Sequence, residues 1–168
     1  MPDLWNIVLI LLAAFFLLHF IKKRRQAKAP IKKLVGLVVH VYDGDTILLS
    51  GKEKVRVRLA GIDAPEKDQP YGDEARIFLA RLIRRKRVLA LVNDVDKYDR
   101  YVAKIICNGR DINAAMIEAG YAWHYKYYNH DRAYAELEKN ARKKHLGLWQ
   151  DKHPEAPWDF RYYQKRNK

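Results

Sequence analysis

Five short apolar runs, three stretches with helical spacing and one long apolar segment at the N-terminus decide the fold class of this 168-residue chain. Together they predict an α+β fold: a five-stranded β-barrel of the OB type with about three helices, preceded by one transmembrane helix. The length suits one domain with an appendage. The expected parts are an anchor at 1–21, a basic linker at 22–33, a barrel domain at 34–150 and a basic, aromatic tail at 151–168.

The N-terminal segment 4–21 is apolar except for Asn6 and His19. As a helix, 18 residues would span about 27 Å, close to the hydrocarbon thickness of a bilayer. A cleaved secretory signal is the alternative, but no positive charge precedes the apolar run. Four basic residues follow it at 22–25. The positive-inside rule therefore predicts a single-pass anchor with the following domain on the cytoplasmic side.

The chain is basic, with 33 Lys and Arg against 20 Asp and Glu and a net charge of +13. Seven basic residues and no acid lie in 22–33, where they act as a topology signal and could also attract anionic lipid or nucleic acid. The excess as a whole favours a polyanionic partner, either nucleic acid or an acidic membrane surface. The single cysteine, Cys107, excludes an internal disulfide and is expected to be buried in a strand.

The expected strands are rich in Val, Ile and Leu and are bounded by turn residues. Asp-Gly-Asp and Ser-Gly-Lys separate the first three, which predicts an antiparallel meander, and Asn108-Gly109 is a tight-turn signal after the last. The strands are expected at 34–42, 46–50, 55–59, 88–92 and 101–107.

The expected helices lie between and after these strands. Apolar residues recur at helical spacing in 73–85, and the stretches 112–119 and 132–146 each stop at a glycine, Gly120 or Gly147, which suits a C-terminal cap.

Acidic residues gather where the expected strands end. Asp43-Gly44-Asp45 lies between the first two strands, and Asp63-Ala64-Pro65-Glu66 follows the third. In a meander these turns can converge at one end of the barrel, and oxygen ligands without His or Cys favour calcium or magnesium. Each motif alone could equally be a turn or a helix start.

Two arginines could complete such a site. Arg58 lies on the third strand and Arg100 at the head of another. Guanidinium groups near a metal can clamp a phosphodiester and stabilise the charge of its transition state. Taken singly, each arginine is also explained by a surface ion pair.

The joint pattern resembles the signature segments of the staphylococcal nuclease (thermonuclease) family. The similarity covers about residues 34–150 and ends at Gly147-Leu148-Trp149. The segments occur in order as Val41-Tyr42-Asp43-Gly44-Asp45-Thr46, Val57-Arg58-Leu59-Ala60-Gly61-Ile62-Asp63-Ala64-Pro65-Glu66, Gly72-Asp73-Glu74-Ala75 and Asp96-Lys97-Tyr98-Asp99-Arg100-Tyr101.

The resemblance implies a role for each matching position. It implies that Asp45, Asp63 and the backbone carbonyl of Ala64 bind calcium and that Glu66 orients or deprotonates the attacking water. Arg58 and Arg100 would bind the phosphate, which makes them catalytic together with Glu66. Tyr98, Tyr125 and Tyr127 match positions near the nucleotide, where aromatic rings stack on bases.

The implied function is a calcium-dependent, monomeric phosphodiester hydrolase of the endonuclease type. It would cleave DNA and/or RNA without strong sequence specificity and leave 3′-phosphate ends. The alternative is a non-catalytic module of the same fold, tethered to the membrane, that binds nucleic acid or a protein. Such a module should have lost part of the site, and all five site residues with functional side chains are present, namely Asp45, Arg58, Asp63, Glu66 and Arg100.

Two departures from the family pattern bear on rate or preference. The loop at 67–71 is shorter than the corresponding loop of the secreted enzyme. Asp99 stands where glycine is common and adds a negative charge beside Arg100.

Overall fold

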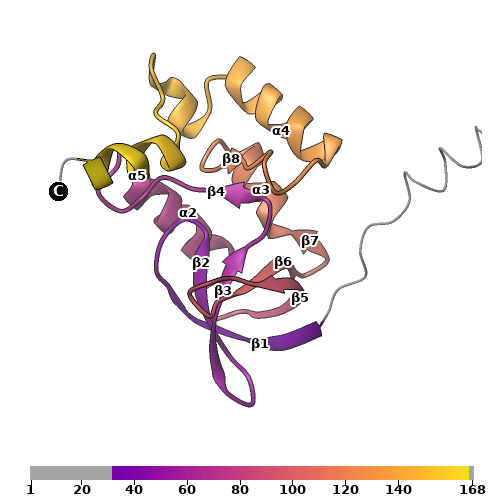
Figure 1. Cartoon of the computed structure of the whole chain (residues 1–168). Helices are drawn as coiled ribbons and strands as arrows, with labels where there is room; N and C mark the ends of the chain where they lie inside the picture. Colours follow the sequence, from indigo (N-terminus) through magenta and orange to yellow (C-terminus); the bar gives the residue numbers. More distant parts are fainter. Residues whose placement is uncertain (1–31, 167–168) are drawn as a thin grey trace, which may run out of the picture.

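The computed structural model describes residues 32–166, whose strands close into a β-barrel (Figure 1). Strand β1 (Lys32–Val41) pairs with β2 (Thr46–Ser50) on one side and with β5 (Arg87–Val95) on the other. Strand β2 pairs with β3 (Lys54–Leu59), and β5 pairs with β6 (Tyr101–Cys107). A parallel pairing of β3 with β6 closes the ring and confirms the predicted five-stranded barrel.

Three short strands extend this framework. Strand β7 (Arg110–Asp111) folds back after the turn at 108–109 and pairs antiparallel with the end of β6. Strands β4 (Ile62–Asp63) and β8 (Trp123–His124) form a separate antiparallel pair. In that pair, Asp63 lies opposite Trp123. Two segments sixty residues apart in sequence are thereby held side by side, at the end of the barrel where the chain leaves β3.

Within residues 32–166, four α-helices and one 3-10 helix surround the barrel, where the sequence predicted about three helices. The three predicted helices are present as α2 (Gly72–Ile83), α3 (Ile112–Glu118) and α4 (Arg132–Lys143). The 3-10 helix η1 (Gly147–Gln150) follows α4. The additional helix is α5 (Pro157–Arg166), in the tail beyond residue 150. Its short, mixed sequence of aromatic and charged residues has no clear apolar face, so periodicity gave no signal for it.

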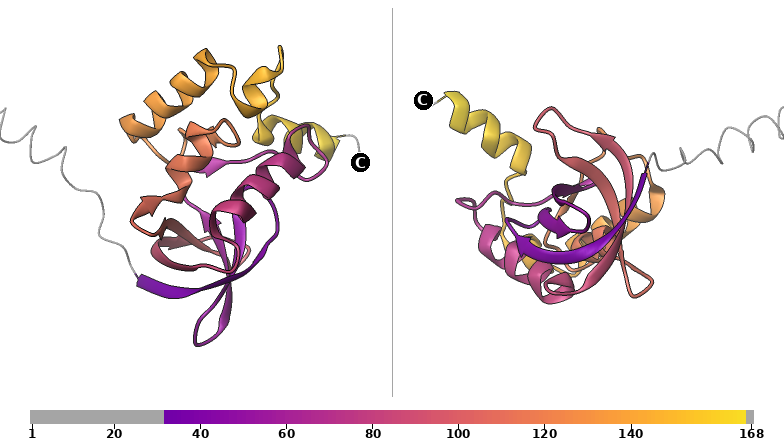
Figure 2. Two further views of the ribbon diagram at one scale, coloured as in Figure 1. Left: turned by 180° about the vertical axis from the view of Figure 1, so that it is seen from behind. Right: turned by 90° about the horizontal axis from the view of Figure 1, so that it is seen from below.

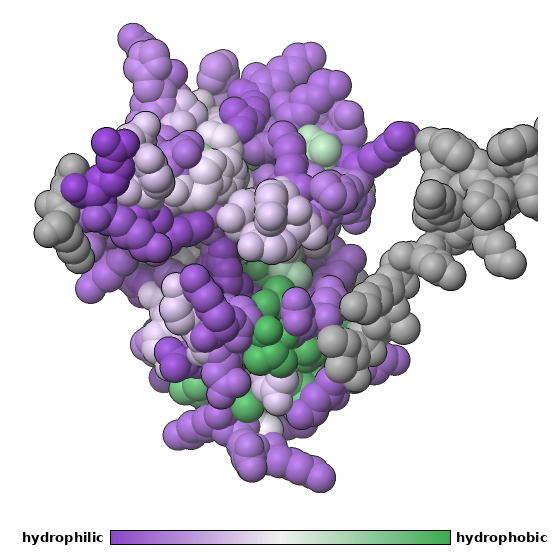
Figure 3. Space-filling view, viewed as in Figure 1, coloured by the Kyte–Doolittle hydropathy of each residue, from purple (hydrophilic) through white to green (hydrophobic). Residues whose placement is uncertain are grey.

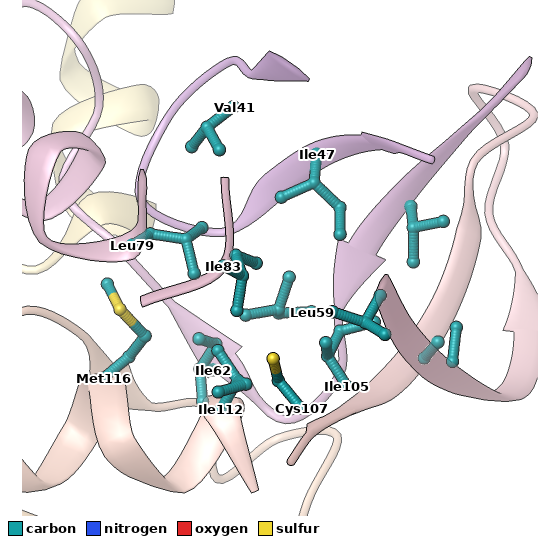
Figure 4. Close-up of a cluster of buried hydrophobic side chains, with 14 of the residues drawn as sticks. Val41, Ile47, Leu59, Ile62, Leu79, Ile83, Ile105, Cys107, Ile112 and Met116 are labelled. Carbon is teal, nitrogen blue, oxygen red and sulfur yellow. The ribbon is translucent and has the colours of Figure 1, made fainter. Parts of the chain in front are cut away.

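The core lies between the barrel and helices α2 and α3 (Figure 4). Helix α2 buries Ala75, Leu79 and Ile83, which recur every four residues and so share one face. Burying a side chain such as Leu79 contributes roughly 1.5–3 kcal/mol. Cys107 is 5% exposed within this core, which confirms the prediction of a buried thiol.

A buried side-chain amide joins α3 to the strands. The Asn113 side chain accepts a hydrogen bond from the Ile105 amide at 2.9 Å and donates to the carbonyls of Ala60 and Ala103 at 2.9 and 3.2 Å. Asn113 is completely buried. It therefore fixes the chain just after β3, from which Gly61 and β4 lead to Asp63.

Within residues 32–166, no helix is long and apolar enough to cross a membrane. The predicted anchor at 1–21 and most of the predicted linker lie outside the described residues, while Lys32 and Lys33 at the linker's end belong to β1.

Candidate active site

The first acidic turn is packed tightly against the start of the second. A Cβ on Gly44 would lie 2.5 Å from the Ala64 Cβ and 2.8 Å from the Ala75 Cβ, so only glycine permits this approach. The result is a buried contact in which the Ala64 amide donates to Asp45 Oδ2 at 2.9 Å. The two turns that the sequence expected to converge therefore do meet.

Arg58 connects the two buried aspartates. Its Nη1 contacts Asp45 Oδ1, and its Nη2 lies 2.6 Å from Asp63 Oδ1. The Asp63 side chain is completely buried and the Arg58 side chain is 16% exposed. Because Arg58 alternates with the core residues Val57 and Leu59 on β3, its side chain points to the carboxylate side of the strand.

Glu66 is held through its backbone, while its side chain stays 38% exposed. The Glu66 amide donates to the Gln69 Oε1 at 3.1 Å, and Gln69 Nε2 donates to the Glu155 carbonyl at 2.7 Å. A Cβ on Gly72 would lie 1.9 Å from the Glu66 carbonyl oxygen. The Glu66 carboxylate is thus offered to solvent from a rigid support.

Helix α5 adds a second guanidinium to the site. Arg161 Nη2 lies 2.8 Å from Asp63 Oδ2, and Arg161 Nη1 lies 2.7 Å from Glu66 Oε1 and 3.2 Å from Asp63 Oδ1. The three views of Figures 1 and 2 agree with these contacts, since α5 (yellow) lies beside the loop between β4 and α2. Arg161 therefore bridges two of the predicted site carboxylates.

The close packing of these charges shifts several pKa values. Burial and the charge of Asp45 raise the pKa of Asp43 to about 7. Burial acts in the same direction on Asp45, but the charge of Arg58 and the Ala64 amide outweigh it and hold the pKa of Asp45 below its usual value. Burial raises the pKa of Asp63 although the hydrogen bond from Arg161 opposes the shift, and the charge of Asp45 adds to it.

Arg100 approaches the same end of the barrel from β6. Its Nε donates to Asp96 Oδ2 at 2.8 Å, and its Nη1 reaches the Thr46 Oγ1 at 3.5 Å. Thr46 in turn donates to Asp45 Oδ1 at 3.1 Å, which links Arg100 to the acidic turn. Asp99 has a φ of 61°, in the left-handed region that glycine adopts most readily, which suits the glycine that the family resemblance implies at this position.

The three predicted substrate tyrosines separate into two places. Tyr98 is 59% exposed and lies near Arg100, whose guanidinium carbon is 5.4 Å from the centre of the ring. Tyr125 and Tyr127 instead line a pocket of about 400 Å³ beside β8. Aromatic side chains form much of its wall, and Glu138 and Arg142 of α4 also line it; the full set is Trp123, His124, Tyr125, Lys126, Tyr127, Glu138, Arg142 and Trp158. A pocket of this kind suits a flat ring.

The oxygen atoms of the predicted metal ligands fit a hard cation such as calcium or magnesium only if water molecules complete its coordination shell. Among residues 32–166, no three or more His, Cys, Asp or Glu side chains are grouped to hold a metal. The predicted ligands are instead two carboxylates, Asp45 and Asp63, and the carbonyl of Ala64. Calcium takes six to eight oxygen ligands, and magnesium keeps several waters, so either ion could use such a partial set.

Sequence reasoning missed two residues that hold the site. Gln69 is 6% exposed, and its side chain forms hydrogen bonds with both the Glu66 amide and the Glu155 carbonyl just before α5. The residues around Gln69 predicted only a loop. Arg161 lies 95 residues beyond Glu66 in the chain. No rule of residue spacing connects such distant positions. The one feature of the sequence that pointed toward Arg161 was the basic, aromatic composition of the tail at 151–168.

The assembled side chains are of the chemical kinds that bind phosphate and activate water, namely guanidinium groups and a carboxylate. Two arginines, Arg58 and Arg100, lie at the end of the barrel that carries the carboxylates, and Glu66 presents a partly exposed carboxylate there. The face seen in Figure 3 is mainly hydrophilic over α4 and α5, with a hydrophobic patch over the barrel. A polar substrate is compatible with the hydrophilic part of this surface.

Comparison with known proteins agrees with the geometry. Residues 56–151 match the family model described as "Staphylococcal nuclease homologue". The chain is 41% identical over 138 residues to a micrococcal nuclease of Shigella flexneri, covering 75% of this chain and 79% of that protein. It is 39% identical over 132 residues to an uncharacterised endonuclease of Haemophilus influenzae, covering 77% and 74%. It is 45% identical over 112 residues to a probable staphylococcal-like nuclease of Oryza sativa subsp. japonica, covering 67% of this chain and only 30% of that longer protein. The chain therefore belongs to the staphylococcal nuclease family.

Proposed function

We propose that this nuclease hydrolyses phosphodiester bonds of DNA and/or RNA as an endonuclease, without strong sequence preference, in a calcium-dependent reaction that leaves 3′-phosphate ends. The observation that carries the proposal is the convergence of Asp45, Arg58, Asp63 and Glu66, from two separate turns and a strand, at one end of the barrel. Burying these charges costs stability, because charged groups are expensive to desolvate, and a functional role explains why the fold keeps the cluster.

Arg58 and Arg100 are the proposed phosphate ligands. The two buried aspartates orient the Arg58 guanidinium, and Asp96 and Thr46 orient that of Arg100. Preorganised guanidinium groups stabilise the negative charge that builds up on the phosphoryl oxygens, without having to reorganise during the reaction.

Glu66 is the proposed base for the attacking water. Its carboxylate is partly exposed and can reach a water molecule, while Gln69 and Gly72 fix its backbone. Asp45, Asp63 and the Ala64 carbonyl would hold the calcium, which when bound would polarise a phosphoryl oxygen and neutralise charge. The Glu66 carboxylate would take the proton from water as the phosphorus–oxygen bond forms.

The tyrosines would hold the bases of the strand. Tyr125 and Tyr127 line the aromatic pocket, and Tyr98 lies exposed beside Arg100. Stacking of bases on aromatic rings tolerates any sequence, which suits a nuclease with little specificity.

The test is a cleavage assay on single-stranded DNA and RNA with calcium, with magnesium and with a chelator. Glu66→Gln should lower kcat by about 10²–10⁴-fold, the usual contribution of a general base. Arg58→Ala should lower it at least as much, and circular dichroism must show that this variant still folds, since it leaves two buried carboxylates without their partner.

Arg56→Ala is the matched control, because Arg56 lies on the same strand two residues from Arg58 and is exposed. It should keep nearly full activity. A folded chain that binds nucleic acid but never cuts it would refute the proposal and favour a binding module of the same fold.

We also propose that the apolar segment 4–21 anchors the nuclease in a membrane, as a monomer with its domain on the cytoplasmic side. The segment's apolar composition and the basic residues that follow it support this arrangement. A reporter fused to the C-terminus tests it, and a reporter found outside the cell would contradict the proposed orientation.

A further inference from the structure

We propose that helix α5 is a built-in competitor at the nuclease site. In its docked position, Arg161 and Trp158 occupy the carboxylates and the tyrosine face that the cation and the substrate strand need. Helix α5 must therefore move away before the site can be loaded. This inference rests on the proposed function, because it assigns the carboxylates to a cation and Tyr125 to a base.

Arg161 uses the acceptor sites that a cation would need. Asp63 Oδ1 accepts from Arg58 Nη2 at 2.6 Å and from Arg161 Nη1 at 3.2 Å, and Asp63 Oδ2 accepts from Arg161 Nη2 at 2.8 Å. A carboxylate has about four lone-pair sites, so these bonds take three of the four on Asp63. Arg161 Nη1 also holds Glu66 Oε1 at 2.7 Å, where a nucleophilic water would lose its proton.

Charge strengthens this exclusion. A guanidinium within hydrogen-bonding distance of Asp63 would repel a dication bound to the same carboxylate. Because the Asp63 side chain is completely buried, little water lies beside it to screen this repulsion. Docked Arg161 and a bound dication therefore oppose each other on Asp63. Arg161 supplies the compensating charge when the cation does not.

Trp158 makes the second competing contact. Its ring lies 5.2 Å from that of Tyr125, with an angle of 10° between the planes. This stacked arrangement is the one a nucleobase would take on Tyr125. Trp158 and Arg161 are three residues apart, so they lie on one face of the helix and dock together.

The helix is attached in a way that permits release. Ala156 and Pro157 are buried and the Glu155 carbonyl is held by Gln69, which fixes the chain just before and at the start of α5. From Trp158 onward no residue of the described helix is fully buried, and Arg161 is 37% exposed. Helix α5 can therefore move away from the site on a hinge at residues 155–157 while the barrel core stays intact.

The experiment measures calcium affinity of the full chain by titration calorimetry, in detergent because of the apolar N-terminal segment. The variant is Arg161→Gln, and the matched control is Arg166→Gln, an exposed arginine on the same helix. If α5 is docked about nine-tenths of the time, only about one-tenth of the molecules can bind calcium, and the apparent Kd for calcium is about tenfold higher than that of the open site. Arg161→Gln should therefore bind calcium about tenfold more tightly, and Arg166→Gln should bind it as the original chain does.

An unchanged or weaker calcium affinity in Arg161→Gln would overturn the proposal. A weaker affinity would assign Arg161 to positioning Asp63 and Glu66 for the reaction. Trp158→Leu, which removes the other contact, should shift the affinity in the same direction as Arg161→Gln and provides the test if Arg161→Gln does not fold.

Limited proteolysis with chymotrypsin separates this inference from the proposed function. Cleavage at Tyr162 and Tyr163, which are 55% and 56% exposed, reports the docking of α5. In chelator, these sites should be cut several-fold faster in Arg161→Gln than in the original chain, which is the reference here because Arg166 contacts the Tyr162 hydroxyl at 3.3 Å. If no variant binds calcium but this difference is present, the calcium proposal fails and the docked helix stands. Equal cleavage rates would refute the docking itself.

Discussion

Replacing Asn113 by alanine tests whether a buried amide holds the scaffold behind Asp63. In the structure the side chain serves three backbone groups, the amide of Ile105 and the carbonyls of Ala60 and Ala103. The Ala103 carbonyl also accepts from the Ala60 amide at 2.8 Å, so it keeps a partner after the substitution. The Ile105 amide and the Ala60 carbonyl lose the bonds described.

The expected cost follows from these two groups. A buried polar group without a partner costs about 1–3 kcal/mol, which applies in full to the Ile105 amide and less to the carbonyl of the half-buried Ala60. Asn113→Ala should therefore lower the free energy of unfolding by about 1–4 kcal/mol. This is a large part of the roughly 5–15 kcal/mol that stabilises a domain. Activity of the folded fraction should fall as well, because Ala60 leads through Gly61 to Asp63, and a 1 Å displacement of a catalytic group can cost about 10²-fold.

Urea denaturation followed by tryptophan fluorescence measures the change. Asn140→Ala is the control, because Asn140 is exposed on α4 and should alter the free energy of unfolding by less than about 0.5 kcal/mol. A loss below about 1 kcal/mol for Asn113→Ala would refute the reasoning, since it would mean that the two backbone groups find other partners at little cost.

Two further predictions concern the acidic turns. Gly72→Ala should reduce kcat about 10²-fold, because its Cβ would lie 1.9 Å from the Glu66 carbonyl oxygen and the backbone must shift. Gly51→Ala, whose nearest contact is 3.4 Å, should leave kcat unchanged, and equal activity of both variants would contradict the prediction. The pKa of Asp43, raised to about 7 in the folded state against about 4 when unfolded, means that stability present at pH 4 is lost as the pH rises through 7. Asp43→Asn should remove that loss, so its advantage over the original chain in the free energy of unfolding should grow by about 3 kcal/mol between pH 5 and pH 8, at about 1.4 kcal/mol for each of the two pH units from pH 5 to the folded pKa. Urea denaturation in chelator measures this, and parallel pH curves would count against a raised pKa.

The sequence was sufficient where structure follows from local patterns. Alternating Val, Ile and Leu between turn residues predicted the five barrel strands. Apolar spacing predicted α2, and a glycine at the expected C-terminal end marked α3 and α4. Asp43-Gly44-Asp45 and the segment from Asp63 to Glu66 stood at strand ends. A meander brings such ends together, so the meeting of the two turns could be expected from the order of elements alone.

Other features depend on packing between distant segments and carry no local signal. Asn113 reads as an ordinary helix residue, and its role appears only when Ile105 and Ala60 face it. Gln69 likewise gains its role from the carbonyl of Glu155.

The sequence by itself determined the barrel, the family and the inventory of acidic and basic groups, because these follow from periodicity, turn chemistry and motif order. The tertiary structure decided how those groups are paired. It joined Arg58 to both buried aspartates and brought Arg161 back across the chain to Asp63 and Glu66. The physical reason is that ion pairs form wherever the fold brings opposite charges within a few ångströms, and separation along the chain does not enter that energy.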